Sequence, residues 1–258
     1  MTAAQSALLG VIQGLTEFLP VSSSGHLVLA QKFFGFREVH VLVDALLHMG
    51  TLLAVLVYFR SDIKAILLGP DRRLAGLLVL GSLPAAIVGL TLKHYIEAAF
   101  TSVPIVSAML LLTGAVLALG DWKSRRPLKR RGLQEARAMD AVGVGLAQAA
   151  AIMPGLSRSG STIVAGIWLN LEPEAAARFS FLLAVPAVLG ASALELVSSG
   201  AGARPPVSVM AVGMASAFVV GMLAIATLLK VLREGRLRAF SYYCFALGTI
   251  SLLAYYLL

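Results

Sequence analysis

The feature that most constrains the fold of this chain is a series of six apolar stretches, each about 20 residues long. A helix of that length crosses the hydrocarbon core of a bilayer. Charged residues make up 13% of the chain, against roughly 25% in soluble domains, and the mean hydropathy is +0.88. We therefore predict an all-α integral membrane protein with six transmembrane helices. The stretches are 41–59, 74–92, 104–120, 178–198, 207–229 and 239–258.

Two further apolar regions, 3–35 and 140–170, are interrupted in the middle by proline and glycine beside several serines. The interruptions read VSSSGH (21–26) and PGLSRSGS (154–161). Irregular backbone at membrane depth is tolerated only where it is buried in protein or lines a cavity, because lipid cannot hydrogen-bond to its amides. We predict two re-entrant helix pairs with unwound centres, and we expect both breaks to form walls of a site.

The basic residues are not spread over one face. Fifteen of the 21 Lys and Arg residues lie in three short connections, 60–73, 121–139 and 230–238. This clustering is typical of cytoplasmic loops, so we expect the net charge of +8 to reflect membrane orientation and not nucleic-acid binding. Placing these connections in the cytoplasm puts 93–103, 199–206 and both termini on the outer side.

Shifting the chain against itself by 135 residues superimposes one broken region on the other without a gap. The shift aligns Gln13 with Gln148, Ser22 with Ser157, Ser24 with Ser159 and Gly25 with Gly160. The first broken pair would enter from outside and the second from the cytoplasm, so the two halves have opposite orientation. We predict one transmembrane domain, 1–258, built from an inverted repeat of about 1–125 and 136–258 joined by the loop 121–139. Such repeats place a site near the bilayer midplane, where the two breaks would face each other.

Gln13 and Glu17 are four residues apart, so on a helix their side chains share one face. A carboxylate and an amide oxygen suit a hard divalent cation such as Mg²⁺ or Ca²⁺, with water or phosphate oxygens completing the shell. The alternative is that Glu17 pairs with Arg158 in a purely structural contact.

Three consecutive serines, Ser22 to Ser24, precede Gly25 and His26. A hydroxyl nucleophile and a general base within a few residues of each other are the parts of a nucleophilic site. An isolated histidine on an apolar face is more often a packing residue, but a neighbouring intramembrane glutamate favours catalysis.

Arg158 is the residue hardest to explain structurally, because an unpaired guanidinium inside the bilayer costs at least about 2.5 kcal/mol. It needs an anion, and it is surrounded by donors suited to phosphate oxygens. These are Ser157, Ser159, Thr162 and the backbone amides around Gly155 and Gly160. The alternative is a salt bridge to Glu17 or Asp44 without a ligand. We expect Asp44, His48 and Gln148 to orient the site; Asp44 and His48 could equally belong to a proton path.

Four segments of the chain closely resemble the bacterial undecaprenyl-pyrophosphate phosphatases, the BacA family. They are QGLTEFLPVSSSGHL (13–27), DALLHMGTLLAV (44–55), PGLSRSGST (154–162) and FSFLLAVP (179–186). The resemblance implies an enzyme of the bacterial inner membrane that hydrolyses the C55 isoprenyl pyrophosphate to the monophosphate and so recycles the lipid carrier of cell-wall synthesis. It also implies a divalent metal and a homodimer. The topology predicted above places the mouth of the cavity on the outer, periplasmic side.

Carried over by position, the resemblance makes Gln13 and Glu17 the acidic metal-binding motif and Ser23 and His26 the nucleophile and its partner. Arg158, with Ser157, Ser159 and Thr162, becomes the pyrophosphate cradle. Position 13 is Glu in many relatives, so Gln13 removes one negative charge from the motif. Direct attack by water remains the alternative to Ser23.

Two other functions compete with this interpretation. Inverted repeats with broken helices are also a transporter architecture, so a lipid-phosphate flippase or anion carrier would explain Arg158 and the hydroxyls equally well. A membrane acid phosphatase is suggested by the SGH element, but its second motif requires a histidine six residues after the arginine, where this chain has Val164.

Overall fold

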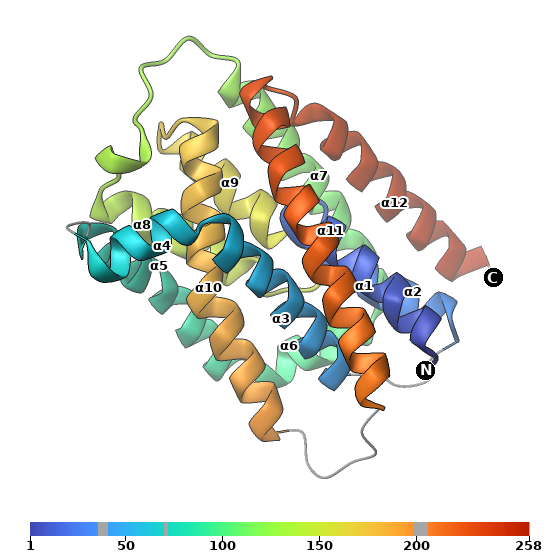
Figure 1. The fold of residues 1–258 in the computed structure, drawn as a ribbon. Coiled ribbons are helices and arrows are strands. Elements are labelled where there is room, and N and C mark those ends of the chain that lie inside the picture. The colour runs from blue at the N-terminus through green and yellow to red at the C-terminus, as the bar shows by residue number, and fades with distance from the viewer. Residues whose placement is uncertain (36–40, 70–71, 199–205, 258) are drawn as a thin grey trace.

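A computed structural model describes residues 1–35, 41–69, 72–198 and 206–257. Within these ranges the chain forms helices and no β-strand, in agreement with the predicted all-α class (Figure 1). The elements are α1 (Ala3–Phe18), α2 (Ser23–Phe33), α3 (Val41–Tyr58), α4 (Arg60–Leu68), α5 (Arg72–Thr91), α6 (Lys93–Phe100), α7 (Val103–Ser124), the short 3₁₀ helix η1 (Leu133–Glu135), α8 (Ala138–Ala150), α9 (Arg158–Trp168), α10 (Pro173–Ser198), α11 (Val207–Arg233) and α12 (Arg238–Leu257).

Five helices in the described residues are long and apolar enough to cross a membrane: α5, α7, α10, α11 and α12. They coincide with five of the six predicted spans. The sixth, 41–59, is the apolar helix α3, which is shorter than the others, so a count of six full spans stays a prediction. Most of the predicted outer connection 199–206 lies outside the described residues.

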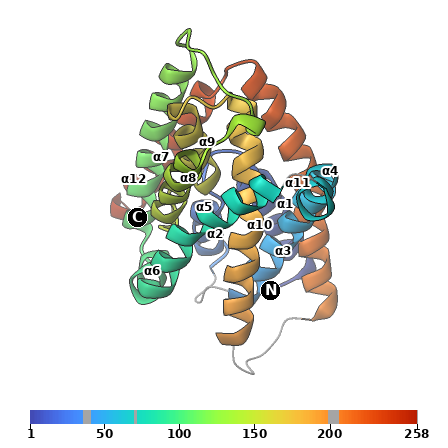
Figure 2. The ribbon, with the colours of Figure 1, turned by 90° about the vertical axis from the view of Figure 1, so that its left-hand side faces the viewer.

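The predicted connections 60–73 and 93–103 are not simple loops, because they contain the short helices α4 and α6. Hydropathy alone overlooked them, since each is under ten residues long and mixes charged with apolar side chains. In both views α10 lies between α5 and α3, and it contacts both (Figures 1 and 2).

Each interrupted apolar region forms two helices separated by a short break. Residues 19–22 separate α1 from α2, and residues 151–157 separate α8 from α9. Figure 1 shows the two pairs approaching the centre of the molecule from opposite sides. The breaks therefore come together in the interior, where irregular backbone can be covered by protein.

Small residues allow the helices of the two pairs to pack closely against long neighbours. A Cβ atom at Gly10 of α1 would collide with the carbonyl oxygen of Gly213 in α11. A Cβ atom at Gly145 of α8 would collide in the same way with the carbonyl oxygen of Gly81 in α5. Contacts of this kind are the usual means by which membrane helices approach each other, because lipid supplies no hydrophobic drive for their association.

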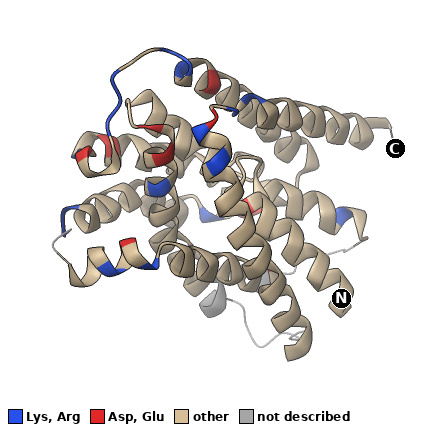
Figure 3. Ribbon diagram, turned by 45° about the horizontal axis from the view of Figure 1, so that its top comes forward, with Lys and Arg blue, Asp and Glu red and all other residues tan. Residues whose placement is uncertain are grey.

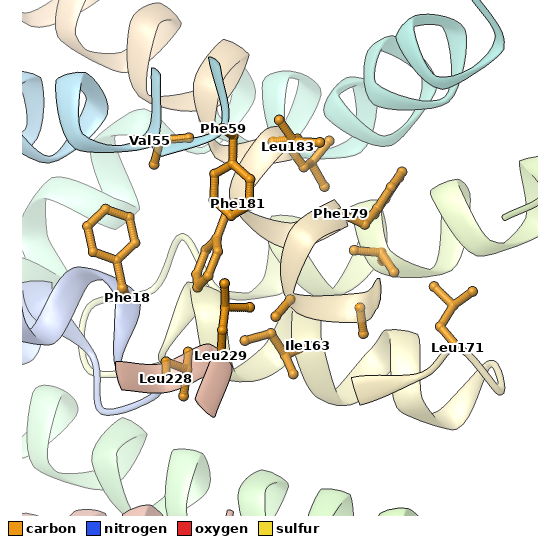
Figure 4. Close-up of a cluster of buried hydrophobic side chains, with 14 of the residues drawn as sticks. Phe18, Val55, Phe59, Ile163, Leu171, Phe179, Phe181, Leu183, Leu228 and Leu229 are labelled. Atoms are coloured by element: carbon orange, nitrogen blue, oxygen red, sulfur yellow. The ribbon is translucent and has the colours of Figure 1, made fainter. Parts of the chain in front are cut away.

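A cluster of large side chains fills the centre of the fold beside the first break (Figure 4). The ring of Phe18, at the end of α1, meets that of Phe181 of α10 edge-on, with 5.4 Å between centroids. Phe59, which directly follows α3, also contacts Phe181, with 6.0 Å between the ring centroids. These rings fix the end of α1, and with it the position of the neighbouring Glu17.

Charged residues gather mainly toward the end of the molecule that carries the 121–139 connection and the turn between α11 and α12 (Figure 3). Several are held in ion pairs there. Arg131 binds both carboxylate oxygens of Asp140 at 2.7 and 2.8 Å, which anchors the connection to the start of α8.

Candidate active site

The two breaks lie directly against each other. A Cβ atom at Gly25 would be 3.2 Å from the Cα of Gly155, and one at Gly160 would be 3.3 Å from the Cβ of Pro20. The Gly155 amide donates a hydrogen bond to Ser24 Oγ at 3.4 Å. Residues 130 to 140 positions apart in sequence therefore form one junction, and the small size of these glycines lets the two breaks approach closely.

The helices that start on the two sides of the junction, α2 and α9, have the same kind of N-terminal cap. Ser22 Oγ accepts a hydrogen bond from the Gly25 amide at 3.3 Å, and Ser157 Oγ accepts one from the Gly160 amide at 3.0 Å. Serine is a preferred N-cap because its oxygen satisfies an amide that the first turn leaves unpaired. Ser22 has a φ of 71°, a strained value for a residue with a side chain, and strain of this kind concentrates at functional sites.

Glu17 is the centre of the hydrogen-bond network at the junction. Its carboxylate is buried, and its Oε2 atom accepts hydrogen bonds from Ser23 Oγ at 2.6 Å and Gln13 Nε2 at 3.1 Å. Its Oε1 atom accepts one from Arg158 Nη2 at 2.6 Å. One carboxylate thus joins a cation, a hydroxyl and an amide that come from both halves of the chain.

Arg158 is the first residue of α9, and its side chain is 16% exposed. Besides Glu17, its guanidinium contacts only the Ser180 carbonyl, at 3.4 Å, among the described residues. The predicted structural partner Asp44 is not involved, because the Asp44 carboxylate accepts hydrogen bonds from Gln31 at 2.9 and 3.0 Å. Since a guanidinium has five N–H donors, Arg158 retains donors for an anion while paired with Glu17.

The remaining hydroxyls of the predicted cradle are held close to Arg158. Ser157 Oγ lies 3.3 Å from Ser159 Oγ, and Ser159 Oγ donates to the Leu19 carbonyl at 3.2 Å. Thr162 Oγ1 lies 2.6 Å from Ser180 Oγ. The N-terminus of α9 therefore lies in a cluster of hydroxyls, an arrangement suited to binding phosphate oxygens.

His26 and Ser23 are not hydrogen-bonded to each other. The His26 ring reaches back along α2, so that Nδ1 lies 2.7 Å from the Ser22 carbonyl oxygen, while Nε2 lies 2.7 Å from the Tyr243 hydroxyl. Ser23 instead bonds to Glu17. The structure therefore brings Ser23 to a carboxylate, and it leaves His26 beside the junction with its ring directed toward α12.

The residues expected to orient the site lie at different distances from it. His48 Nε2 is 3.8 Å from Glu17 Oε2, and its Nδ1 bonds to the Asp44 carbonyl at 2.7 Å. His48 thus lies between Glu17 and the backbone of Asp44. Gln148 is buried, and neither of its amide atoms has a hydrogen-bond partner among the described residues.

The donor set for a divalent cation is small. No group of three or more His, Cys, Asp or Glu side chains that could hold a metal occurs in the described part of the chain. Gln13 Oε1, however, is buried without a hydrogen-bond partner there, while the Nε2 atom of the same amide donates to the Glu17 carboxylate. These oxygens fit a cation such as Mg²⁺, which usually takes one or two protein oxygens and the rest from phosphates and water.

Comparison with known proteins places the chain in a family. A sequence model of the family described as bacitracin resistance protein BacA matches residues 6–250. The chain belongs to the BacA family.

Relatives of this BacA-family chain named undecaprenyl-diphosphatase match it over nearly its whole length. One from Syntrophotalea carbinolica is 45% identical over 258 residues, covering 96% of this chain and 97% of the relative. Another, from Desulforapulum autotrophicum, is 42% identical over 272 residues and covers 97% of each. A third, from Korarchaeum cryptofilum, is 43% identical over 265 residues, with 96% and 97% covered.

Three residues that contact the site in this BacA-family chain were missed in the sequence. Thr113 of α7 holds the second break, because its hydroxyl accepts from the Ser157 amide and donates to the Gly155 carbonyl, both at 2.9 Å. The other two are Ser180, which contacts Arg158 and Thr162, and Tyr243, which contacts His26. Only Ser180 carried a signal, since it lies in the segment FSFLLAVP; the other two sit in ordinary apolar spans.

Proposed function

We infer that this protein is a membrane phosphatase that hydrolyses undecaprenyl diphosphate to undecaprenyl phosphate and inorganic phosphate. Membership of the BacA family and the name of its relatives, undecaprenyl-diphosphatase, support this substrate. The observation that carries the chemistry is the buried contact of Glu17 with both Ser23 and Arg158, where two helices begin. A hydroxyl, a proton acceptor and a phosphate-binding cation are thereby held at one point.

Binding of the diphosphate would use the positive features of the junction. Arg158, the hydroxyls of Ser157, Ser159 and Thr162, and the N-termini of α2 and α9 would surround the phosphate oxygens. Ser22, Ser24 and Gly25 would form the opposite wall. The isoprenoid tail would stay in the bilayer, because only the charged head group gains from entering a polar site.

The reaction would begin with attack of Ser23 Oγ on the terminal phosphorus. The bond from that phosphorus to the bridging oxygen breaks, the lipid monophosphate leaves, and the Ser23 proton passes to Glu17 Oε2, which is 2.6 Å away. Water then attacks the phosphoserine phosphorus, the bond from phosphorus to Ser23 Oγ breaks, and Glu17 returns the proton to Ser23 Oγ as inorganic phosphate is released. We propose that His26, a neutral base at the start of α2, accepts the proton of this water. The sequence had suggested that His26 accepts the proton of Ser23.

A divalent cation would be held through Glu17 and Gln13 Oε1. When bound, it neutralises charge that develops on the transferring phosphoryl oxygens, which is where most catalysis of phosphoryl transfer originates. Arg158 acts on the same charge from the side of α9. His48 limits the movement of Glu17 from the side of α3.

We also propose that the chain is an inverted repeat, a single domain in the bacterial inner membrane with the site open to the outer side. Equal spacing supports the repeat, since the serine caps at Ser22 and Ser157 and the tight crossings at Gly10 and Gly145 are each 135 residues apart. The clustered basic connections support the orientation. The flippase alternative shares this architecture, but it gives no reason for the hydroxyl of Ser23 to be hydrogen-bonded to Glu17.

The test is phosphate release from C55 or C15 isoprenyl diphosphate by the purified protein in detergent, with Mg²⁺ or with EDTA. We expect metal-dependent release that Arg158→Ala abolishes and Arg236→Ala does not, because Arg236 is an exposed arginine far from the junction in sequence. Transport needs a sealed membrane, whereas hydrolysis does not. A folded protein that binds the lipid without releasing phosphate would replace the phosphatase with a carrier.

A further inference from the structure

Tyr243 of α12 makes a close contact with His26 of α2. The Tyr243 hydroxyl lies 2.7 Å from His26 Nε2, and the two rings are nearly parallel, with an angle of 4° between their planes and 5.6 Å between centroids. The partners are 217 residues apart in sequence. The hydrogen bonds at Nδ1 and Nε2 together fix both the position and the orientation of the imidazole.

The second nitrogen of His26 determines which group donates in this contact. His26 Nδ1 lies 2.7 Å from the Ser22 carbonyl oxygen, which can only accept, so Nδ1 carries the proton. In the neutral ring Nε2 then has a lone pair and no proton, and the Tyr243 hydroxyl donates to it. Tyr243 therefore keeps Nε2 as the nitrogen with the lone pair, the one through which His26 can accept a proton.

The position of Tyr243 is set by its neighbours on α12. Ser241 Oγ donates to the Gly114 carbonyl of α7 at 2.7 Å, and Cys244 lies buried with its Sγ 3.8 Å from the Pro20 carbonyl. These contacts on either side of Tyr243 attach α12 to α7 and to the first break. The hydroxyl of Tyr243 thus reaches His26 from a fixed backbone, although its own ring is 47% exposed.

We propose that Tyr243 is a positioning residue of the phosphatase reaction, which holds the His26 ring with Nε2 unprotonated and ready to accept a proton. This inference rests on the function proposed above. The hydroxyl of Tyr243 releases Nε2 when the reacting water takes its place as the donor. Tyr243 acts on the reaction only through His26, and its hydroxyl contacts the ring and not the diphosphate.

The first experiment compares Tyr243→Phe with Tyr242→Phe. The phenylalanine at 243 keeps the aromatic ring and loses only the donor, so Nε2 is no longer held in place. We expect kcat to fall about threefold to tenfold, the effect of losing one hydrogen bond, with KM changed less than about twofold. Tyr242 is the matched control, because it is an exposed neighbour on the same helix that contacts Arg238 and not His26. An unchanged kcat in Tyr243→Phe would overturn the proposal.

A double-mutant cycle with His26→Ala tests whether Tyr243 acts through His26. We expect Tyr243→Phe to have no further effect on kcat once His26 is absent, because the group that it positions has been removed. Effects that multiply in the double variant would show that Tyr243 acts independently of His26, and the proposal would fail.

A third measurement does not depend on turnover. Nitrogen NMR of ¹⁵N-histidine-labelled protein should show His26 with its proton on Nδ1, and Tyr243→Phe should shift the Nε2 resonance while Tyr242→Phe leaves it in place. An Nε2 resonance unaffected by Tyr243→Phe would contradict the contact. If the wild type shows the expected signals but releases no phosphate, the proposed function has failed while the Tyr243–His26 contact stands.

Discussion

Arg158 and Glu17 show how one ion pair can serve both alternatives that the sequence left open. Their contact of 2.6 Å neutralises two charges in an apolar region, as a structural pair would. The other donors of Arg158 make only the long contact with Ser180. The pair therefore leaves N–H donors of the guanidinium available at the start of α9, and these donors can bind an anion as well.

We expect Arg158→Lys to reduce kcat/KM at least about 100-fold, although the charge is retained. A lysine ammonium cannot contact Glu17 and two phosphate oxygens with the planar donors of a guanidinium. Steady-state phosphate release measures the effect, with Arg236→Lys as the control. Near-normal turnover of Arg158→Lys would show that only charge, and not donor geometry, is used.

Ser23→Ala distinguishes a covalent mechanism from direct attack by water. If Ser23 is the nucleophile, the variant should lose at least about 100-fold in kcat while it still binds the lipid. Rapid quenching of the wild type with ³²P-labelled substrate should also trap a phosphoserine. Normal turnover in Ser23→Ala, with Glu17→Ala and Arg158→Ala inactive, would assign the attack to water.

Gln13→Glu should strengthen metal binding, because it restores a second negative charge beside Glu17. We expect the Mg²⁺ concentration for half-maximal activity to fall severalfold, and EDTA to abolish the activity of both proteins. A Mg²⁺ titration of phosphate release checks this. An unchanged Mg²⁺ dependence would remove Gln13 from the metal site.

At the scale of elements, the helix pairs α1–α2 and α8–α9 are positioned by close crossings and not by their own hydropathy. Gly10 and Gly145 bring α1 and α8 against the backbones of α11 and α5. Thr113 then holds the second break between α8 and α9 from the side of α7. The junction between the two breaks is thus supported by the long helices that surround it.

Gly145→Leu should destabilise the protein, because the new side chain would collide with the Gly81 backbone. Overpacking of this kind costs roughly 1–3 kcal/mol, so we expect thermal unfolding in detergent to occur several degrees lower. Gly190→Leu is the matched control, since a Cβ atom at Gly190 of α10 meets nothing within 4 Å. Equal stability of the two variants would show that the α5–α8 crossing is looser than described.

At the scale of the whole molecule, orientation decides which face of the membrane supplies the substrate. Single cysteines at Lys129 and Thr101, introduced into a Cys244→Ser background, report it, because both positions are exposed. In intact cells, we expect an impermeant thiol reagent to label Thr101→Cys, and Lys129→Cys only after the membrane is opened. The reverse labelling pattern would place the basic connections outside the cell and the opening of the site on the cytoplasmic face.

Several parts of the fold could be predicted because they depend on neighbouring residues. Runs of apolar residues locate α5, α7, α10, α11 and α12, and the serine, glycine and proline of the two interruptions locate the breaks. The candidate residues Glu17, Ser23 and Arg158 were found for a similar reason, since a polar residue in an apolar run is conspicuous wherever it packs.

The partners of these residues were not predictable in the same way. The sequence paired Ser23 with His26 because they are only three residues apart, whereas in the folded chain Ser23 bonds to Glu17 and His26 to Tyr243. The sequence alone thus determined the membrane environment, the long apolar helices with the two breaks, and the chemical groups, which follow from local hydropathy and capping. Only the tertiary structure decided which groups meet, because contacts between α1, α9 and α12 depend on how distant helices pack.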